Sequence, residues 1–195
     1  MMKLSTIASL LLVGGVASQT ICPTELTQSQ ELTDTLTLYY EVVDNVLCAR
    51  MESFNEGWLG FGISPSGKRP MHPAEAIMGL PEEGSVLKYD LSAESESGVV
   101  PMSDDKQTLM DTNITQADGM TVMTFAKVLD EDQYPLVAGD NTCIYAESTS
   151  NAFGFHNNHP HYFVLKLADS SGSDATMKRG FMAIAFGAMA VWFGL

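Results

Sequence analysis

The stretch GWLGFGISPSGKRPMHPAEAIMG, residues 57–79, decides the fold. Bulky apolar side chains alternate with glycines over residues 57–63, which is typical of a strand whose backbone is approached closely from one side. Residues 64–70 are rich in Pro, Gly and Ser and predict a turn or loop. Residues 74–79 are apolar again and predict another strand. Met71 therefore ends a loop between two strands, where its thioether either fills a gap in the core or faces a bound group.

Short runs of β-branched and aromatic residues recur along the chain, separated by Gly, Pro, Asp and Asn turns. The segments predicted to be strands are residues 35–43, 46–52, 57–63, 74–79, 85–91, 120–127, 141–146 and 162–167. Residues 92–112 are polar and predict a long loop with a short strand at most. This pattern predicts one all-β domain, an immunoglobulin-like antiparallel β-sandwich, within residues 19–169.

Residues 1–18 have the composition of a signal peptide. A basic start at Lys3 is followed by a short apolar centre and by small residues that end at Ser18. A transmembrane helix needs about 20 apolar residues, and this centre is shorter. We therefore expect cleavage after Ser18 and entry into the secretory pathway.

The other end of the chain has an apolar, uncharged tail over residues 180–195, preceded by a polar segment over residues 170–179. Small residues, a polar spacer and an apolar tail of about 10 to 20 residues form a glycolipid (GPI) anchor signal. A retained transmembrane helix is the alternative, although the tail is short for one. We expect residues 170–179 to be a linker that includes the anchor-attachment residue. Both ends of the chain thus predict the extracellular face of the plasma membrane or of another membrane, with anchoring by the C-terminus.

The chain is acidic, with 24 Asp and Glu against 10 Lys and Arg and a formal net charge of −14. An acidic surface repels phosphate, so this charge excludes nucleic acid as a partner. It favours a basic protein or a cation as a partner, and it also keeps an exported protein soluble.

An odd number of cysteines in an oxidising compartment allows one disulfide and one free thiol. Cys22 lies near the mature N-terminus, where a bridge to Cys48 or to Cys143 would tie that end to the domain. The sequon that begins at Asn113 predicts a surface loop that carries a glycan, which makes the chain a glycoprotein.

Several motifs resemble, in the same order, those of the DOMON domain. They are residues 57–62, Met71, residues 74–79, Tyr89-Asp90, residues 121–129 and residues 144–146. The resemblance covers about residues 36–167, and it departs at Lys127, where many members have Arg. It implies a β-sandwich that binds haem b or, in some members, sugar.

The chain looks most like the haem-binding, cytochrome b-type branch, in which one Met and one His hold the iron. Met71 lies at the family's methionine position, and His156 best matches the histidine that precedes the last strand. His159 and His161 are alternative ligands. The side chains expected to form the walls around the haem are Phe61, Ile63, Phe153 and Phe155.

The resemblance implies an extracellular haem b electron-transfer domain that exchanges electrons with a redox protein or with a small-molecule donor or acceptor. Because a thioether and an imidazole leave no open position on the iron, we expect a non-catalytic carrier rather than an enzyme. It would be a component of a ferric-reductase-like system. The segment from Arg179 to Gly187 is similar to the start of the transmembrane b-type cytochrome that follows DOMON domains in such fusions, which have His in place of Arg179.

Two other functions use the same part of the sequence. His156, His159 and His161, with His72 as a further ligand, form a candidate copper or zinc site, because imidazole suits these metals. A carbohydrate-binding module without an electron-transfer role is the second alternative. Sugar binding requires neither Met71 nor His156, so this pair of residues favours haem.

Overall fold

The computed structural model describes residues 20–65, 71–131, 133–154, 156 and 161–168, and of His161 it describes the backbone only. The predicted signal peptide, polar linker and apolar tail lie outside the described residues. Phe155 and His159 lie outside them as well.

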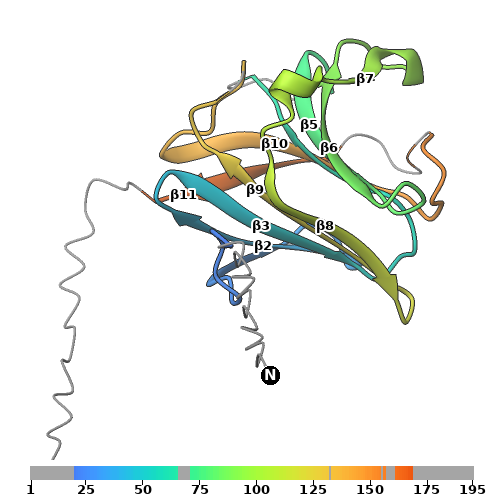
Figure 1. The fold of residues 1–195 in the computed structure, drawn as a ribbon, viewed down its shortest axis with the longest axis horizontal. Helices are drawn as coiled ribbons and strands as arrows, with labels where there is room; N and C mark the ends of the chain where they lie inside the picture. The colour runs from blue at the N-terminus through green and yellow to red at the C-terminus, as the bar shows by residue number, and fades with distance from the viewer. Residues whose placement is uncertain (1–19, 66–70, 132, 155, 157–160, 169–195) are drawn as a thin grey trace, which may run out of the picture.

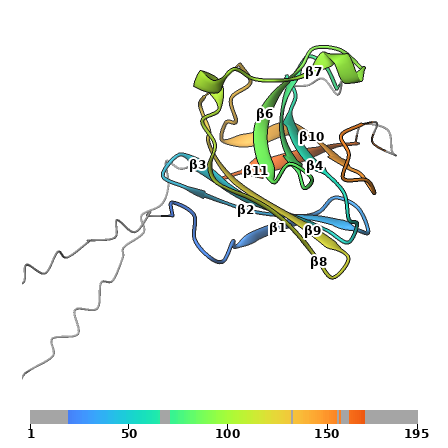
Figure 2. The same cartoon turned by 45° about the vertical axis from the view of Figure 1, so that its right-hand side comes forward.

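Two antiparallel sheets face one another as a sandwich, as Figure 1 and Figure 2 show. In order across the sheet, one has β1 (Gln28–Glu31), β2 (Leu36–Val43), β3 (Val46–Ser53), β9 (Met120–Val128) and β8 (Met110–Ala117). The other has β11 (His161–Leu167), β10 (Gly139–Glu147), β4 (Leu59–Ile63), β5 (Ala74–Leu80), β6 (Ser85–Leu91) and β7 (Val99–Pro101). Short 3-10 turns, η1 (Glu96–Gly98) and η2 (Asp104–Lys106), flank β7. The predicted all-β antiparallel sandwich is confirmed.

Alternation along β4 assigns neighbouring residues to opposite faces of the six-stranded sheet. Phe61 faces the other sheet, and its ring centroid lies 5.4 Å from that of Phe125 and 6.1 Å from that of Phe163. Gly60 and Gly62 face the opposite, outer side. The main core therefore lies between the sheets. On the outer face of β4, the two glycines contribute no side chain that covers the backbone.

A second apolar cluster covers this outer face of the six-stranded sheet. Its buried members are Trp58, Ala74, Ala76, Met78, Leu80, Tyr89, Leu91 and Ile144, and Met71 packs against them partly buried. This sheet is therefore apolar on both faces. An apolar outer face is typical of a surface that binds a ligand or a partner.

A carboxylate links the two sheets at one end of the sandwich. Glu147 Oε1 accepts hydrogen bonds from the hydroxyls of Thr33, at 3.2 Å, and Thr35, at 3.0 Å. Glu147 Oε2 accepts from Ser53 Oγ at 2.7 Å and from Asn55 Nδ2 at 3.1 Å. Because β10 supplies the acceptor and the β2–β3 region supplies the donors, this network joins the two sheets at that end.

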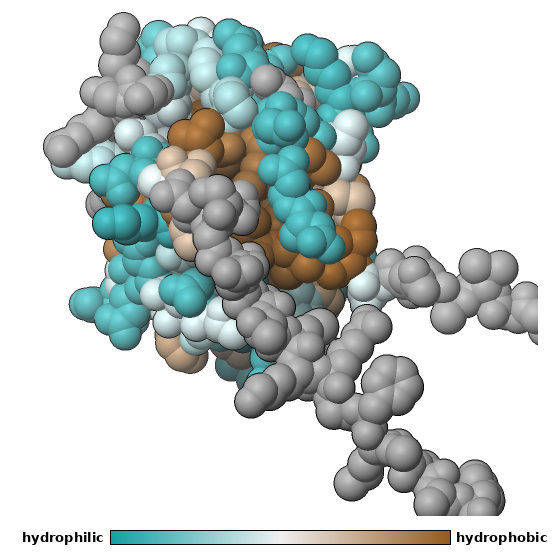
Figure 3. All heavy atoms as spheres, turned by 90° about the vertical axis from the view of Figure 1, so that its left-hand side faces the viewer, coloured by the Kyte–Doolittle hydropathy of each residue, from teal (hydrophilic) through white to brown (hydrophobic). Residues whose placement is uncertain are grey.

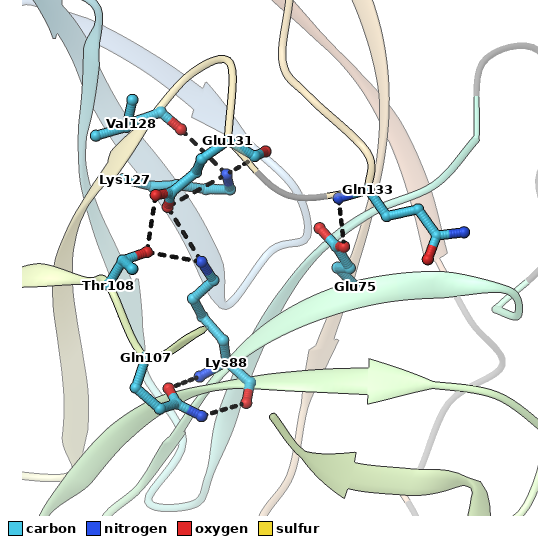
Figure 4. Close-up of polar contacts among 8 residues, drawn as sticks. All are labelled: Glu75, Lys88, Gln107, Thr108, Lys127, Val128, Glu131 and Gln133. Carbon is cyan, nitrogen blue, oxygen red and sulfur yellow. Dashed lines mark hydrogen bonds and ion pairs between the residues drawn. The ribbon is translucent and has the colours of Figure 1, made fainter. Parts of the chain in front are cut away.

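A network of buried charges occupies the other end (Figure 4). Lys88 and Lys127 point inward from β6 and β9, and both side chains are almost fully buried. Glu131 Oε1 lies 3.1 Å from Lys88 Nζ and 3.6 Å from Lys127 Nζ, and Thr108 bridges Lys88 and Glu131. Such lysines are retained in an interior only when acceptors surround them, so this end of the inter-sheet space is polar.

The prediction of a loop over residues 92–112 is only partly right, because β8 already begins at Met110. β8 and β1 escaped prediction because they are edge strands with polar sequences, and in β8 only Ile114 is buried. The sequon at Asn113 consequently lies in a strand and not in a surface loop. The Asn113 side chain is nevertheless exposed.

The N-terminal segment is tied to the five-stranded sheet. Cys22 forms a disulfide with Cys48 of β3, which decides between the two pairings that the sequence left open. The carboxylate of Asp111 also accepts the backbone N–H groups of Ile21, at 2.9 Å, and Cys22, at 3.1 Å. Cys143 is a free thiol in the core between the sheets, where burial raises its pKa to about 12.

Hydrophobic residues also reach the surface, and the face drawn in Figure 3 has a hydrophobic area with hydrophilic residues around it. The exposed large apolar side chains are Ile21, Phe54, Val100, Val137, Phe153, Tyr162 and Val164. Among the residues that the structure describes, none belongs to a helix long and apolar enough to cross a membrane.

The thiols provide a test of this arrangement. We expect no thiol of the native protein to react with an aromatic disulfide reagent at neutral pH, and one thiol per chain to react after unfolding in urea. Removing the bridge by Cys22→Ser should lower the free energy of unfolding by about 3.5 kcal/mol, because the bridge joins residues 26 positions apart and so closes a long loop. Two or three reactive thiols in the unfolded, unreduced chain would contradict the pairing.

Candidate functional site

A cavity of about 400 Å³ lies on the outer face of the six-stranded sheet. Its floor consists of small and apolar residues from the three adjacent strands β10, β4 and β5, namely Gly60, Gly62, Ala76, Met78, Ile144 and Ala146. The walls come from the loops around these strands. A concave, mostly apolar site of this size is the usual form of a small-molecule or cofactor site.

The two floor glycines have different surroundings. A Cβ built on Gly60 would meet the Cβ of Ala146 at 3.6 Å, which is ordinary contact. A Cβ built on Gly62 would clash with the Ile144 side chain. Ile144 therefore already fills the space above Gly62, whereas Gly60 leaves the floor open to a ligand.

Met71 supplies one wall of the cavity, at the end of the sheet where β5 begins. Its side chain is partly buried against the outer apolar cluster. The next residue, His72, has its Nε2 atom 3.8 Å from Oε1 of Glu94, on the segment that follows β6. This contact joins the segment before β5 to the segment after β6, and the two segments are neighbours at this end of the sheet.

His156 supplies a wall at the end of β4 where that strand begins, on the segment that follows β10. Its imidazole contacts the indole of Trp58, with ring centroids 6.3 Å apart and planes at 79°. Phe153 also packs against the indole, with ring centroids 6.0 Å apart and planes at 48°. An aromatic wall thus stands at the end of the cavity occupied by the imidazole.

One rim of the cavity is acidic. Glu94 and Glu96 line it from the segment around η1, with Ser95 between them, and both carboxylates are exposed. We expect this side to repel the carboxylates of a ligand and to attract cations. A ligand with an acidic group would therefore direct that group away from the Glu94 and Glu96 rim of the cavity.

The DOMON domain family model matches residues 32–148, which is more than half of the 195-residue chain. The chain belongs to the DOMON domain family. The match extends over β2 to β10 and includes Met71, while His156 lies eight residues beyond its end. The family assignment therefore supports the predicted fold, and the choice of a haem-binding branch needs separate support.

Several of the residues that the sequence nominated as the DOMON site do come together. Met71, His156 and Phe153 all line the cavity on the outer face. The predicted wall residues Phe61 and Ile63 do not line it, because they have the opposite parity on β4 and face the core between the sheets. Their nomination as walls around a haem stays a prediction, and it does not apply to this cavity.

The remaining nominated residues lie outside what the structure describes. Phe155 and His159 are not among the described residues, and for His161 only the backbone is described, paired with Tyr145 in β11. The structure describes no group of three or more His, Cys, Asp or Glu side chains arranged to hold a metal ion within its described ranges. The copper or zinc hypothesis also needs His159 and the side chain of His161, which lie outside the described part of the structure, so it stays a prediction.

Sequence reasoning missed Trp58, Met78 and Ile144, although a signal for the first was present. Trp58, Gly60 and Gly62 share one parity along the strand, so a glycine floor on the outer face also places Trp58 there. Ile144 is adjacent to Gly62 through the pairing of β10 with β4, and this register is not evident from the sequence.

The glycine floor provides a matched test. Gly62→Ala should lower the free energy of unfolding by about 1–3 kcal/mol, because its methyl overpacks against Ile144. Gly60→Ala should change it by less than about 0.5 kcal/mol. Urea denaturation of both variants measures the difference. The pair Gly62→Ala with Ile144→Ala should cost less than the sum of the single changes, and simple additivity would contradict the clash.

Proposed function

We propose that this DOMON domain binds haem b in the cavity on the outer face of its six-stranded sheet and acts as a single-electron carrier. The observation that carries the proposal is that Met71 and His156, nominated from the sequence as axial ligands, line one cavity although 85 positions separate them. One lies near the beginning of β5 and the other lies near Trp58, so they approach the cavity from different loops.

The lining of the cavity fits a porphyrin in several respects. Its floor is thin and apolar, and its walls include the half-buried Met71 and His156 with the aromatic pair Trp58 and Phe153. A thioether and an imidazole are a known ligand pair for haem iron in electron-transfer proteins. The acidic rim does not suit propionates, so we expect the charged edge of the group to leave the cavity on a side away from Glu94.

Met71 and His156 would hold the haem, which would supply single-electron exchange and leave no iron position open to a substrate. The apolar floor excludes water and disfavours additional positive charge, which favours the ferrous state. Glu94 and Glu96 act in the opposite direction, since their negative charges favour the ferric state. The chain's residues would therefore set the reduction potential by a balance between apolar burial and an acidic rim.

The cellular setting is part of the same proposal. We infer an extracellular carrier, anchored to a membrane through residues 170–195, that exchanges electrons with a redox protein or with a small molecule. Its acidity favours partners with a basic surface and disfavours nucleic acid.

The carbohydrate alternative has less support from the cavity. A sugar site needs several polar groups that face the ligand, and here the polar lining residues are mainly the rim residues Glu94, Ser95 and Glu96. The hydroxyl of Tyr145 donates a hydrogen bond to the Leu32 carbonyl at 3.1 Å and therefore points toward the five-stranded sheet, away from the cavity. The floor offers no hydrogen-bonding side chain.

Haem titration of the mature domain tests the proposal. We expect one haem per chain, with the sharp reduced α and β bands of a low-spin, six-coordinate b-type cytochrome. Met71→Ala and His156→Ala should each abolish this spectrum or convert it to a high-spin form, since each removes an axial ligand.

Two variants serve as controls for that titration. His72→Ala removes a histidine next to Met71, and Met120→Ala removes a methionine that does not line the cavity. Both should keep the low-spin spectrum. A domain that stays colourless, or one whose spectrum survives both ligand variants, would contradict the proposal.

A further inference from the structure

We propose that Trp58 is the positioning residue for His156, in that the indole fixes the orientation of the imidazole plane at the cavity wall. This inference rests on the proposed function, because the imidazole matters as an axial ligand of haem. Trp58 itself would not ligate the iron.

The backbone of Trp58 is fixed to the segment that leads to His156. The Trp58 N–H donates to the Ser150 carbonyl at 3.2 Å, and its own carbonyl accepts the Ser148 N–H at 3.0 Å. The preceding residue, Gly57, is packed so closely against Ser148 that a Cβ there would clash with the Ser148 carbonyl. The start of β4 is therefore hydrogen-bonded to the end of β10 and to the residues that follow it, a few positions before His156.

The Trp58 side chain then contacts that loop twice. Only 3% of the Trp58 residue is exposed, so the packing around the indole restricts its orientation. Its ring lies 6.0 Å from that of Phe153 and 6.3 Å from that of His156, and the imidazole plane is nearly perpendicular to it at 79°. Aromatic pairs prefer such edge-to-face contacts, so a fixed indole restrains the tilt of the partner ring.

The shape of the indole, and not its N–H, carries this role. The Trp58 Nε1 atom is buried and makes no hydrogen bond in the described structure. A phenyl ring at this position would keep an aromatic face toward His156 without a buried donor. Trp58→Phe should thus preserve the positioning, and Trp58→Leu should lose it.

Electron paramagnetic resonance of the oxidised, haem-loaded domain measures the effect, because the spread of the g values depends on the orientation of the axial imidazole. We expect Trp58→Leu to change the g values and to weaken haem binding by about tenfold or more. Trp58→Phe should keep the wild-type g values. Tyr89→Leu is the matched control: Tyr89 is a buried aromatic of the same outer cluster that does not line the cavity, so this change should lower the urea midpoint and leave the g values unchanged.

A measurement on the haem-free protein separates this inference from the proposed function. Nuclear Overhauser contacts between the Trp58 indole protons and the His156 imidazole protons should be present in the wild-type domain without haem. Their absence, or wild-type g values in haem-loaded Trp58→Leu, would overturn the positioning role. If Trp58→Leu fails to fold, two other results would still overturn the positioning role. One is the absence of the Overhauser contacts in the haem-free wild-type domain, and the other is a change of the g values in haem-loaded Trp58→Phe. Failure of the wild-type domain to bind haem would instead overturn the proposed function.

Discussion

The alternation of side chains along β4 is the constraint on which the rest of the structure depends. A strand has a period of two, so the bulky Phe61 and Ile63 must face one side if Gly60 and Gly62 face the other. The bulky side faces the five-stranded sheet and builds the core. The glycine side faces outward and becomes the floor of the cavity between Met71 and the His156 wall. The alternation along this short strand thereby determines the position of the core, between the sheets, and the position of the cavity, on the outer face.

Polar networks at both ends of the sandwich support this division. Glu147 collects hydroxyl and amide donors at one end, and Glu131 lies between two buried lysines at the other. The cavity of about 400 Å³ lies outside the sandwich, on the sheet that is apolar on both faces. Lys127, which stands where many DOMON members have Arg, belongs to the second network. Its difference from those members therefore concerns the interior and not the cavity.

Much of the fold could be predicted from the sequence, because its central strands are strongly patterned and every predicted strand is present. The edge strands β1 and β8 could not, since a strand with one partner and a solvated face has a polar sequence. The meeting of Met71 and a loop before the last strand followed from family resemblance, and the structure brings Met71 and His156 to one cavity. Phe61 does not line this cavity, because neighbouring residues on a strand face opposite sides of the sheet. The partner of Cys22 required three-dimensional register, because nothing local distinguishes Cys48 from Cys143.

A crystal structure of the haem-loaded mature domain tests the central claim most directly. The account predicts a porphyrin against the outer face of the six-stranded sheet, above Gly60, with the Met71 sulfur and a nitrogen of His156 on opposite sides of the iron. A porphyrin bound between the two sheets, or an iron that Met71 does not reach, would contradict it.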